Sequence, residues 1–173
     1  DTIIQLKWKI LEESVYFPLI SISPIVEFPT GNQKYLMGNG KVDGGTGILF
    51  RKIIGDISFY GNFYYISIGE TVHTQNVKVR PYIWTGVYAI SYKWSDKLSI
   101  LAQLNDCTSP YKSSVKNLDS SSSLFSLGFK YSTSEKMLFS LSFSEDFSHK
   151  TTPDVTLNFS FSYLFGWLFN DKD

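Results

Sequence analysis

Apolar and hydrophilic side chains alternate with a period of two residues along most of this chain. At its start Ile4, Leu6 and Trp8 lie on one face of an extended segment, whereas Gln5 and Lys7 lie on the other. Successive side chains of a β-strand point to opposite faces, so each such segment predicts a strand with one apolar face. We predict about nine strands, at residues 4–10, 18–28, 42–53, 57–68, 82–94, 97–106, 123–132, 137–144 and 155–163.

Short and long connections alternate between the predicted strands. Barrels of the bacterial outer membrane show this alternation, because short turns join their strands on the periplasmic side and long loops join them outside. The sequence therefore predicts an all-β, antiparallel transmembrane β-barrel over residues 1–165, followed by a short C-terminal tail at 166–173. Short links fall at 55–56, 95–96 and 133–135, and long polar links at about 29–41, 69–81, 107–122 and 147–154.

The hydrophilic face of the predicted strands distinguishes two kinds of β-protein. A soluble β-sandwich or lipocalin-like barrel also alternates, but it presents Lys and Glu outward. Here the hydrophilic positions are mainly Ser, Thr, Asn, Gln and Gly, and no charged residue interrupts the apolar face at 98–104 or 155–163. A Lys or Arg that faces lipid at mid-depth costs about 2–4 kcal/mol. The pattern thus favours an apolar face toward hydrocarbon and small polar residues toward an enclosed lumen.

Aromatic residues make up 17% of the chain, a high share for a soluble domain. Several fall near the ends of predicted strands, where outer-membrane barrels carry aromatic girdles at the two membrane interfaces. The run 158–165 also resembles the C-terminal strand signal that the outer-membrane insertion machinery recognises, which implies this machinery and membrane lipids as partners. The predicted interface residues are Trp8, Trp84, Trp94, Tyr131, Tyr163 and Phe165.

The number of predicted strands adds an expectation about the whole barrel. With the short links inside, the first strand runs from the outside inward, whereas outer-membrane barrels keep their N-terminus in the periplasm and use even strand numbers. We therefore expect at least one strand to precede Asp1. The chain would then be the C-terminal portion of an even-numbered barrel of about 10–14 strands, completed by an N-terminal half or by another subunit.

A series of short motifs also carries a family resemblance. Their order and spacing resemble a group of poorly characterised bacterial outer-membrane β-barrel proteins, one family of unknown function and a neighbouring family labelled as barrels of the meta-pathway of phenol degradation. The resemblance implies a barrel in a bacterial-type outer membrane, and it implies no established activity. The motifs are Glu27–Gly31, Gly38–Gly40, Val42–Gly47, Leu98–Leu104, Ser109–Tyr111, Phe143–Asp146 and Thr152–Asp154.

Composition and spacing exclude several other classes of function. Lys plus Arg and Asp plus Glu both number 16, so no basic surplus attracts nucleic acid. The single Cys107 has no neighbour at metal-ligand spacing, and we expect no metal site and no cofactor. Both histidines, His73 and His149, fall in long links. A barrel hydrolase built on His149 is only a distant third hypothesis, and we expect no enzyme.

The charged and amide side chains on the hydrophilic face are the candidate lumen residues. In a narrow barrel they would pair across the interior as a plug, and in a wide one they would line a path for solutes. We expect a porin-like barrel that passes or binds small molecules; the alternative is a structural or assembly-partner subunit of an outer-membrane complex. The candidate lumen-lining residues are Asp43, Arg51, Asn62, Gln103, Asn105, Lys130 and Asp146.

Overall fold

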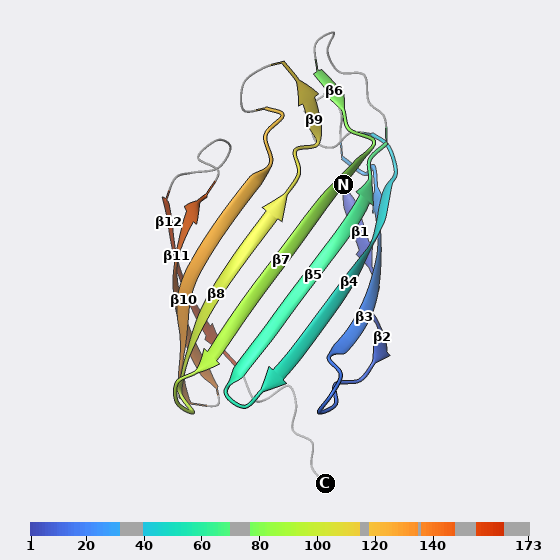
Figure 1. Cartoon of the computed structure of the whole chain (residues 1–173). Coiled ribbons are helices and arrows are strands. Elements are labelled where there is room, and N and C mark those ends of the chain that lie inside the picture. The colour runs from blue at the N-terminus through green and yellow to red at the C-terminus, as the bar shows by residue number, and fades with distance from the viewer. Residues whose placement is uncertain (32–39, 70–76, 115–117, 135, 148–154, 165–173) are drawn as a thin grey trace.

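The computed structural model of the chain is all-β and consists mainly of one large antiparallel sheet (Figure 1). It describes the chain except residues 32–39, 70–76, 115–117, 135, 148–154 and 165–173. In the part described, ten strands form the large sheet and two form a separate ribbon. The large sheet contains β1 (Thr2–Gln5), β2 (Trp8–Leu11), β3 (Leu19–Phe28), β4 (Asp43–Ile54), β5 (Ile57–Ser67), β7 (Tyr82–Lys93), β8 (Leu98–Cys107), β10 (Ser122–Ser134), β11 (Met137–Asp146) and β12 (Val155–Tyr163), and the ribbon contains β6 (Val77–Val79) and β9 (Tyr111–Ser113).

Neighbouring strands of the large sheet follow one another along the chain. The order is β1, β3, β4, β5, β7, β8, β10, β11 and β12, and β2 also pairs with β3. Short turns join the strands at one end of the sheet and long links join them at the other (Figure 1). Gly55 allows the short turn between β4 and β5, because its φ of 57° lies in the left-handed region that glycine enters without strain. Apart from the first, the predicted strands are confirmed, and so is the alternation of short and long links.

The first predicted strand differs from the prediction, because it is interrupted between β1 and β2. The backbone N–H of Leu6 donates to the carbonyl of Pro24 at 3.1 Å, but Pro24 has no N–H with which to bond the carbonyl of Leu6 in return. The hydroxyl of the fully buried Ser23 donates to that carbonyl instead, at 2.9 Å, and accepts a bond from Nε2 of Gln5 at 2.8 Å. One buried serine therefore satisfies the backbone where the ladder is broken.

The ribbon of β6 and β9 is a second difference. These strands lie within two long links that the sequence pattern assigned to loops, and they pair antiparallel from Val77 with Ser113 to Val79 with Tyr111. An ion pair between Arg80 and Asp119 ties the same two links together just beyond the ribbon. The ribbon lies past the long-link end of the large sheet (Figure 1).

The two faces of the large sheet differ in the way that the alternation predicts, and the apolar face is the more exposed one. Ile48 is 57% exposed, Leu127 49% and Phe159 70%. No hydrophobic side chain among the described residues is buried, whereas Ser23, Ser144 and Asp146 are. A β-sandwich needs a second sheet packed on the apolar face, and the described residues form no such sheet.

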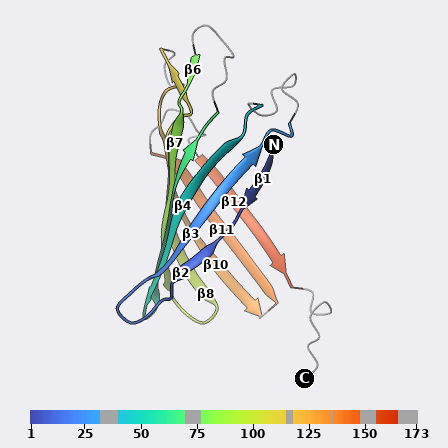
Figure 2. The same cartoon turned by 90° about the vertical axis from the view of Figure 1, so that its right-hand side faces the viewer.

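The sheet curves into a trough, as the two perpendicular views show (Figures 1 and 2). In the part of the chain that the structure describes its edges are open, because there β12 pairs only with β11, and β1 and β2 pair only with β3. The described residues therefore do not close a barrel among themselves. A search of the same residues for a helix long and apolar enough to cross a membrane found none.

Candidate functional site

Hydrophilic side chains line the concave face of the trough. Nε2 of Gln5 on β1 donates to the hydroxyl of Tyr64 on β5 at 2.6 Å, although β3 and β4 separate these strands in the sheet. Strands lie about 4.8 Å apart, so a flat sheet would place β1 and β5 about 14 Å from each other. The hydrogen bond therefore reaches across a strongly curved surface, and it fixes this face as the inner one.

Gly47 makes room for this contact. The ring of Tyr64 lies against Gly47, where an added Cβ would meet its ring atoms. On the opposite, convex face the ring of Phe50 covers Gly61 in the same manner. Glycines opposite aromatic rings let a sheet bend sharply while the rings fill the space that a side chain would take.

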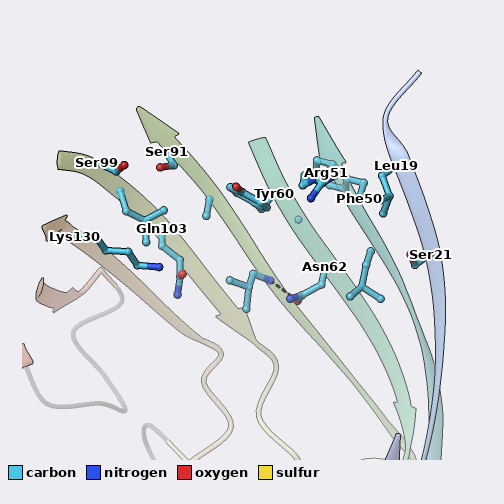
Figure 3. Close-up of a pocket in the computed structure, with 15 residues that line it drawn as sticks. Leu19, Ser21, Phe50, Arg51, Tyr60, Asn62, Ser91, Ser99, Gln103 and Lys130 are labelled. Carbon is cyan, nitrogen blue, oxygen red and sulfur yellow. Dashed lines mark hydrogen bonds between the residues drawn. The ribbon is translucent and has the colours of Figure 1, made fainter. Parts of the chain in front are cut away.

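A cavity of about 480 Å³ opens on the concave face, within the range of typical small-molecule sites. Side chains from β3, β4, β5, β7, β8 and β10 line it (Figure 3). Strand register explains how they meet: Arg51 is opposite Tyr60, Tyr60 is opposite Ala89, and Ala89 is opposite Gln103. Paired residues share a face of a sheet, so this row crosses the floor of the cavity.

Arg51, at one side of the cavity, has its charge compensated. Its Nε donates to Oε2 of Glu13 at 3.1 Å, and Oε1 of Glu13 accepts the backbone N–H of Ile53 at 2.6 Å. The hydrogen bond from Ile53 and the cations Arg51 and Lys52 lower the pKa of Glu13 below its usual value. The ionised Glu13 therefore stabilises this corner at neutral pH, and that contribution is lost as the pH falls through the lowered pKa.

Lys130, at the other side of the cavity, has no such partner. It is opposite Ser99 in the register of β8 and β10, and its side chain extends toward Gln103 (Figure 3). The residues that line the cavity in the described structure include no Asp or Glu, and Lys130 makes no ion pair with a described residue. Among the described residues the cavity thus holds one cation with a carboxylate partner, Arg51, and one without, Lys130.

A family model described as a protein of unknown function, DUF3187, matches residues 10–165. The chain belongs to this family. The match covers β3 to β12 and the cavity, and the expected membership of a family of unknown function is confirmed. The DUF3187 description states neither an activity nor a location. No curated protein matches the chain.

In this DUF3187 protein, four of the seven predicted lumen residues meet at the cavity. They are Arg51, Asn62, Gln103 and Lys130. Asn62 accepts the backbone N–H of Val87 at 3.2 Å through Oδ1, and Gln103 donates to Oδ1 of Asn105 at 3.0 Å through Nε2. Both amides are therefore held in place by neighbouring groups.

The other three predicted lumen residues lie away from the cavity. Asn105 is on the concave face but outside the lining. Asp43 begins β4 at the long-link end and accepts the backbone N–H of Gly69 at 2.7 Å. Asp146 ends β11 and is fully buried. The two carboxylates are thus at the end of the trough where the DUF3187 protein has its long links.

Glu13 and Tyr60 belong to the site but are not among the predicted lumen residues. Glu13 lies in the link between β2 and β3, and only the folded structure brings it to Arg51. The alternation places Tyr60 on the hydrophilic face, and the structure shows it lining the cavity. The predicted lumen residues are restricted to charged and amide side chains, so Tyr60 is not among them. The sole signal for Glu13 is an acidic residue in a short link at the same end of the sheet as Arg51.

The predicted interface aromatics are exposed. Trp84 stacks with Phe63 on the convex face, with ring centroids 5.0 Å apart, and the ring centroid of Tyr65 lies 4.4 Å from that of Trp84. The sixth predicted interface aromatic, Phe165, lies outside the described residues. His73 and His149 also lie outside them, so the hydrolase hypothesis built on His149 is not tested by the structure. The remaining predicted aromatics that are exposed are Trp8, Trp94, Tyr131 and Tyr163.

No metal centre is formed in the part of the DUF3187 chain that the structure describes. A search of that part found no group of three or more His, Cys, Asp or Glu side chains that could hold an ion. Cys107 is exposed and forms no disulfide.

Proposed function

We propose that this chain is part of an outer-membrane β-barrel of the bacterial type that passes or binds small molecules. The observation that carries the proposal is the distribution of side chains between the two faces. Apolar residues are exposed on the convex face, while hydrophilic residues and the cavity occupy the concave one. In this proposal the convex face contacts hydrocarbon and the concave face lines an aqueous lumen.

The energetics of the convex face support a lipid environment. Soluble monomers rarely expose contiguous apolar patches of more than a few hundred Å², and here the apolar positions of every long strand share one exposed face. Charged side chains on that face, such as Lys52, Asp106 and Glu145, lie toward the ends of their strands. The 12, 11 and 12 residues of β4, β5 and β7 match the roughly 9–11 residues that a tilted strand needs to cross a bilayer.

Closing the sheet into a barrel requires further strands. With β2 off the path, nine strands follow one another from β1 to β12 along the antiparallel sheet. Eight reversals of direction separate the two edges, so β1 and β12 run in the same direction and cannot pair antiparallel with each other. An odd number of added strands would allow antiparallel closure and give an even total. We infer that these strands come from a further segment of the protein or from another subunit.

A structural or assembly role is the second candidate, and the β6–β9 ribbon favours it. The ribbon and the Arg80–Asp119 ion pair give the two long links a defined surface beyond the sheet. Such a surface suits contact with another protein better than a mobile loop does. Copurification of the protein with a large complex in mild detergent, with loss of the complex on changing ribbon residues, would support this role.

Conductance tests passage through the lumen directly. We expect the whole protein to give stepwise currents in planar lipid bilayers. Glu13→Gln removes the carboxylate that compensates Arg51 and should shift the reversal potential toward anion selectivity, whereas Arg51→Ala should shift it toward cation selectivity. Lys97→Ala, in the turn between β7 and β8, is the matched control and should leave it unchanged.

The prediction is specific because the two substitutions should shift the reversal potential in opposite directions. Shifts of the same sign for Glu13→Gln and Arg51→Ala would contradict a lumen lined by this ion pair. If the parent protein gave neither current nor liposome swelling, passage of solutes would be ruled out. Binding of small molecules and the assembly role would then be the remaining candidate functions.

A further inference from the structure

The side chains that line the cavity indicate which class of small molecule could bind there. Its concave surface combines a cation that has no carboxylate partner among the described residues with a group of apolar side chains. Leu49, Val87 and Leu101 line the cavity between the polar rows, on a face whose other residues are largely Ser, Asn and Gln. Apolar side chains exposed in an aqueous lumen are unfavourable unless another apolar group covers them.

Lys130 has two polar neighbours on β8. Ser99 is its direct neighbour across β8 and β10, and Figure 3 shows Gln103 on the side toward which Lys130 extends. Nε2 of Gln103 carries two N–H donors, and one of them bonds Asn105. The second N–H of Gln103 and the ammonium group of Lys130 can donate to the oxygens of one carboxylate.

Arg51 does not compete for this anion. Glu13 already holds its guanidinium on the opposite side of the cavity, so the attraction is concentrated at Lys130. Electrostatic focusing of this kind in a concave site raises the local concentration of small anions.

We propose that the cavity binds a small amphipathic monocarboxylate, with its carboxylate at Lys130 and Gln103 and its hydrocarbon part on Leu49, Val87 and Leu101. This inference rests on the proposed function, because it names the class of molecule that the lumen would take. It requires both parts of the ligand: the charge gives orientation, and the apolar body contributes most of the buried area.

Isothermal titration of the whole protein in nanodiscs of zwitterionic lipid tests the inference. The probes are cyclohexanebutyrate, its neutral primary amide and inorganic phosphate, with empty nanodiscs as the blank. We expect saturable binding of the carboxylate, at least tenfold weaker binding of the amide, and no detectable binding of phosphate, which lacks the apolar body. Equal affinity for the carboxylate and the amide would overturn the assignment, as would a preference for phosphate.

Two variants locate the site. Lys130→Gln should weaken binding of cyclohexanebutyrate at least tenfold, while Lys136→Gln, in the turn that follows β10, should leave it unchanged. Ser99→Asp places a carboxylate opposite Lys130 without removing the lysine, and it should cause a similar loss. Binding of cyclohexanebutyrate that is unaffected by both Lys130→Gln and Ser99→Asp would refute the site. If only one of the two variants folds, unaffected binding in that variant would refute it.

Conductance measured on the same preparations separates this inference from the proposed function. Currents without saturable carboxylate binding would refute the binding site and would still support passage of solutes. Saturable binding without current would contradict passage of solutes through the barrel and would still support the binding site.

Discussion

Leu127→Arg is expected to lower the free energy of unfolding in a phospholipid bilayer by about 2–4 kcal/mol, whereas Leu101→Arg should change it by about 0.5 kcal/mol or less. Leu127 lies near the middle of β10 on the convex face and is 49% exposed. Leu101 lies on the neighbouring β8 and lines the concave cavity. The same substitution therefore places an arginine in hydrocarbon in one variant and in an aqueous lumen in the other.

Denaturant titration of the two variants in lipid vesicles gives both free energies. The comparison is informative because a water-soluble protein would respond differently. In water an arginine at the exposed Leu127 would be nearly neutral, and an arginine at Leu101 would be the more costly change. A larger loss for Leu101→Arg than for Leu127→Arg would contradict the proposed orientation of the faces.

Gly45→Ala is expected to destabilise the sheet by about 1–3 kcal/mol through overpacking. A Cβ at Gly45 would collide with the carbonyl oxygen of Tyr65 and lie 2.9 Å from Cα of Ile66. Both atoms belong to the backbone of β5, which pairs with β4 throughout this region, so the clash cannot be relieved by rotating a side chain. Denaturant titration of the purified variant measures the loss.

The adjacent Gly44 provides the control. A Cβ at Gly44 would have the carbonyl oxygen of Ile25 as its nearest neighbour, at an ordinary 3.7 Å. Gly44→Ala should therefore be neutral or slightly stabilising, because alanine reduces the freedom of the unfolded chain. Equal effects of the two substitutions would mean that β4 and β5 do not pack as closely as this register requires.

The strands and their faces were predictable because the signal for them is local. Alternation such as that of Phe125, Leu127 and Phe129 with Ser126 and Gly128 needs no knowledge of the rest of the chain. The same local pattern assigned these residues to the face on which they lie. It also gave the ends of the long strands to within a few residues.

The differences in the fold arise from interactions that are distant in sequence. The interruption between β1 and β2 depends on Pro24 lying opposite Leu6, where its missing N–H breaks the ladder. The β6–β9 ribbon pairs Val77–Val79 with Tyr111–Ser113, segments too short to show an alternating pattern. Neither feature has a signal in its own segment.

The candidate site was predictable in part for a related reason. Alternation indicates the face on which a residue lies, so it brought Arg51 and Lys130 to the concave side. It does not give the position along a curved strand, which separates Asp43 and Asp146 from the cavity. The compensation of Arg51 by Glu13 depends on the path of a link, about which periodicity carries no information.

Spin labels placed one at a time along β10 test the central proposal most directly. Single cysteines at residues 124–131, in a Cys107→Ser background, would be labelled in lipid vesicles and their collision rates measured with oxygen, which concentrates in hydrocarbon, and with a water-soluble nickel complex. We expect a period of two, with oxygen favoured at Phe125, Leu127 and Phe129 and the nickel complex favoured at Ser126, Gly128 and Lys130. The opposite phase, or equal access of the nickel complex to both faces, would contradict a sheet whose convex face contacts lipid.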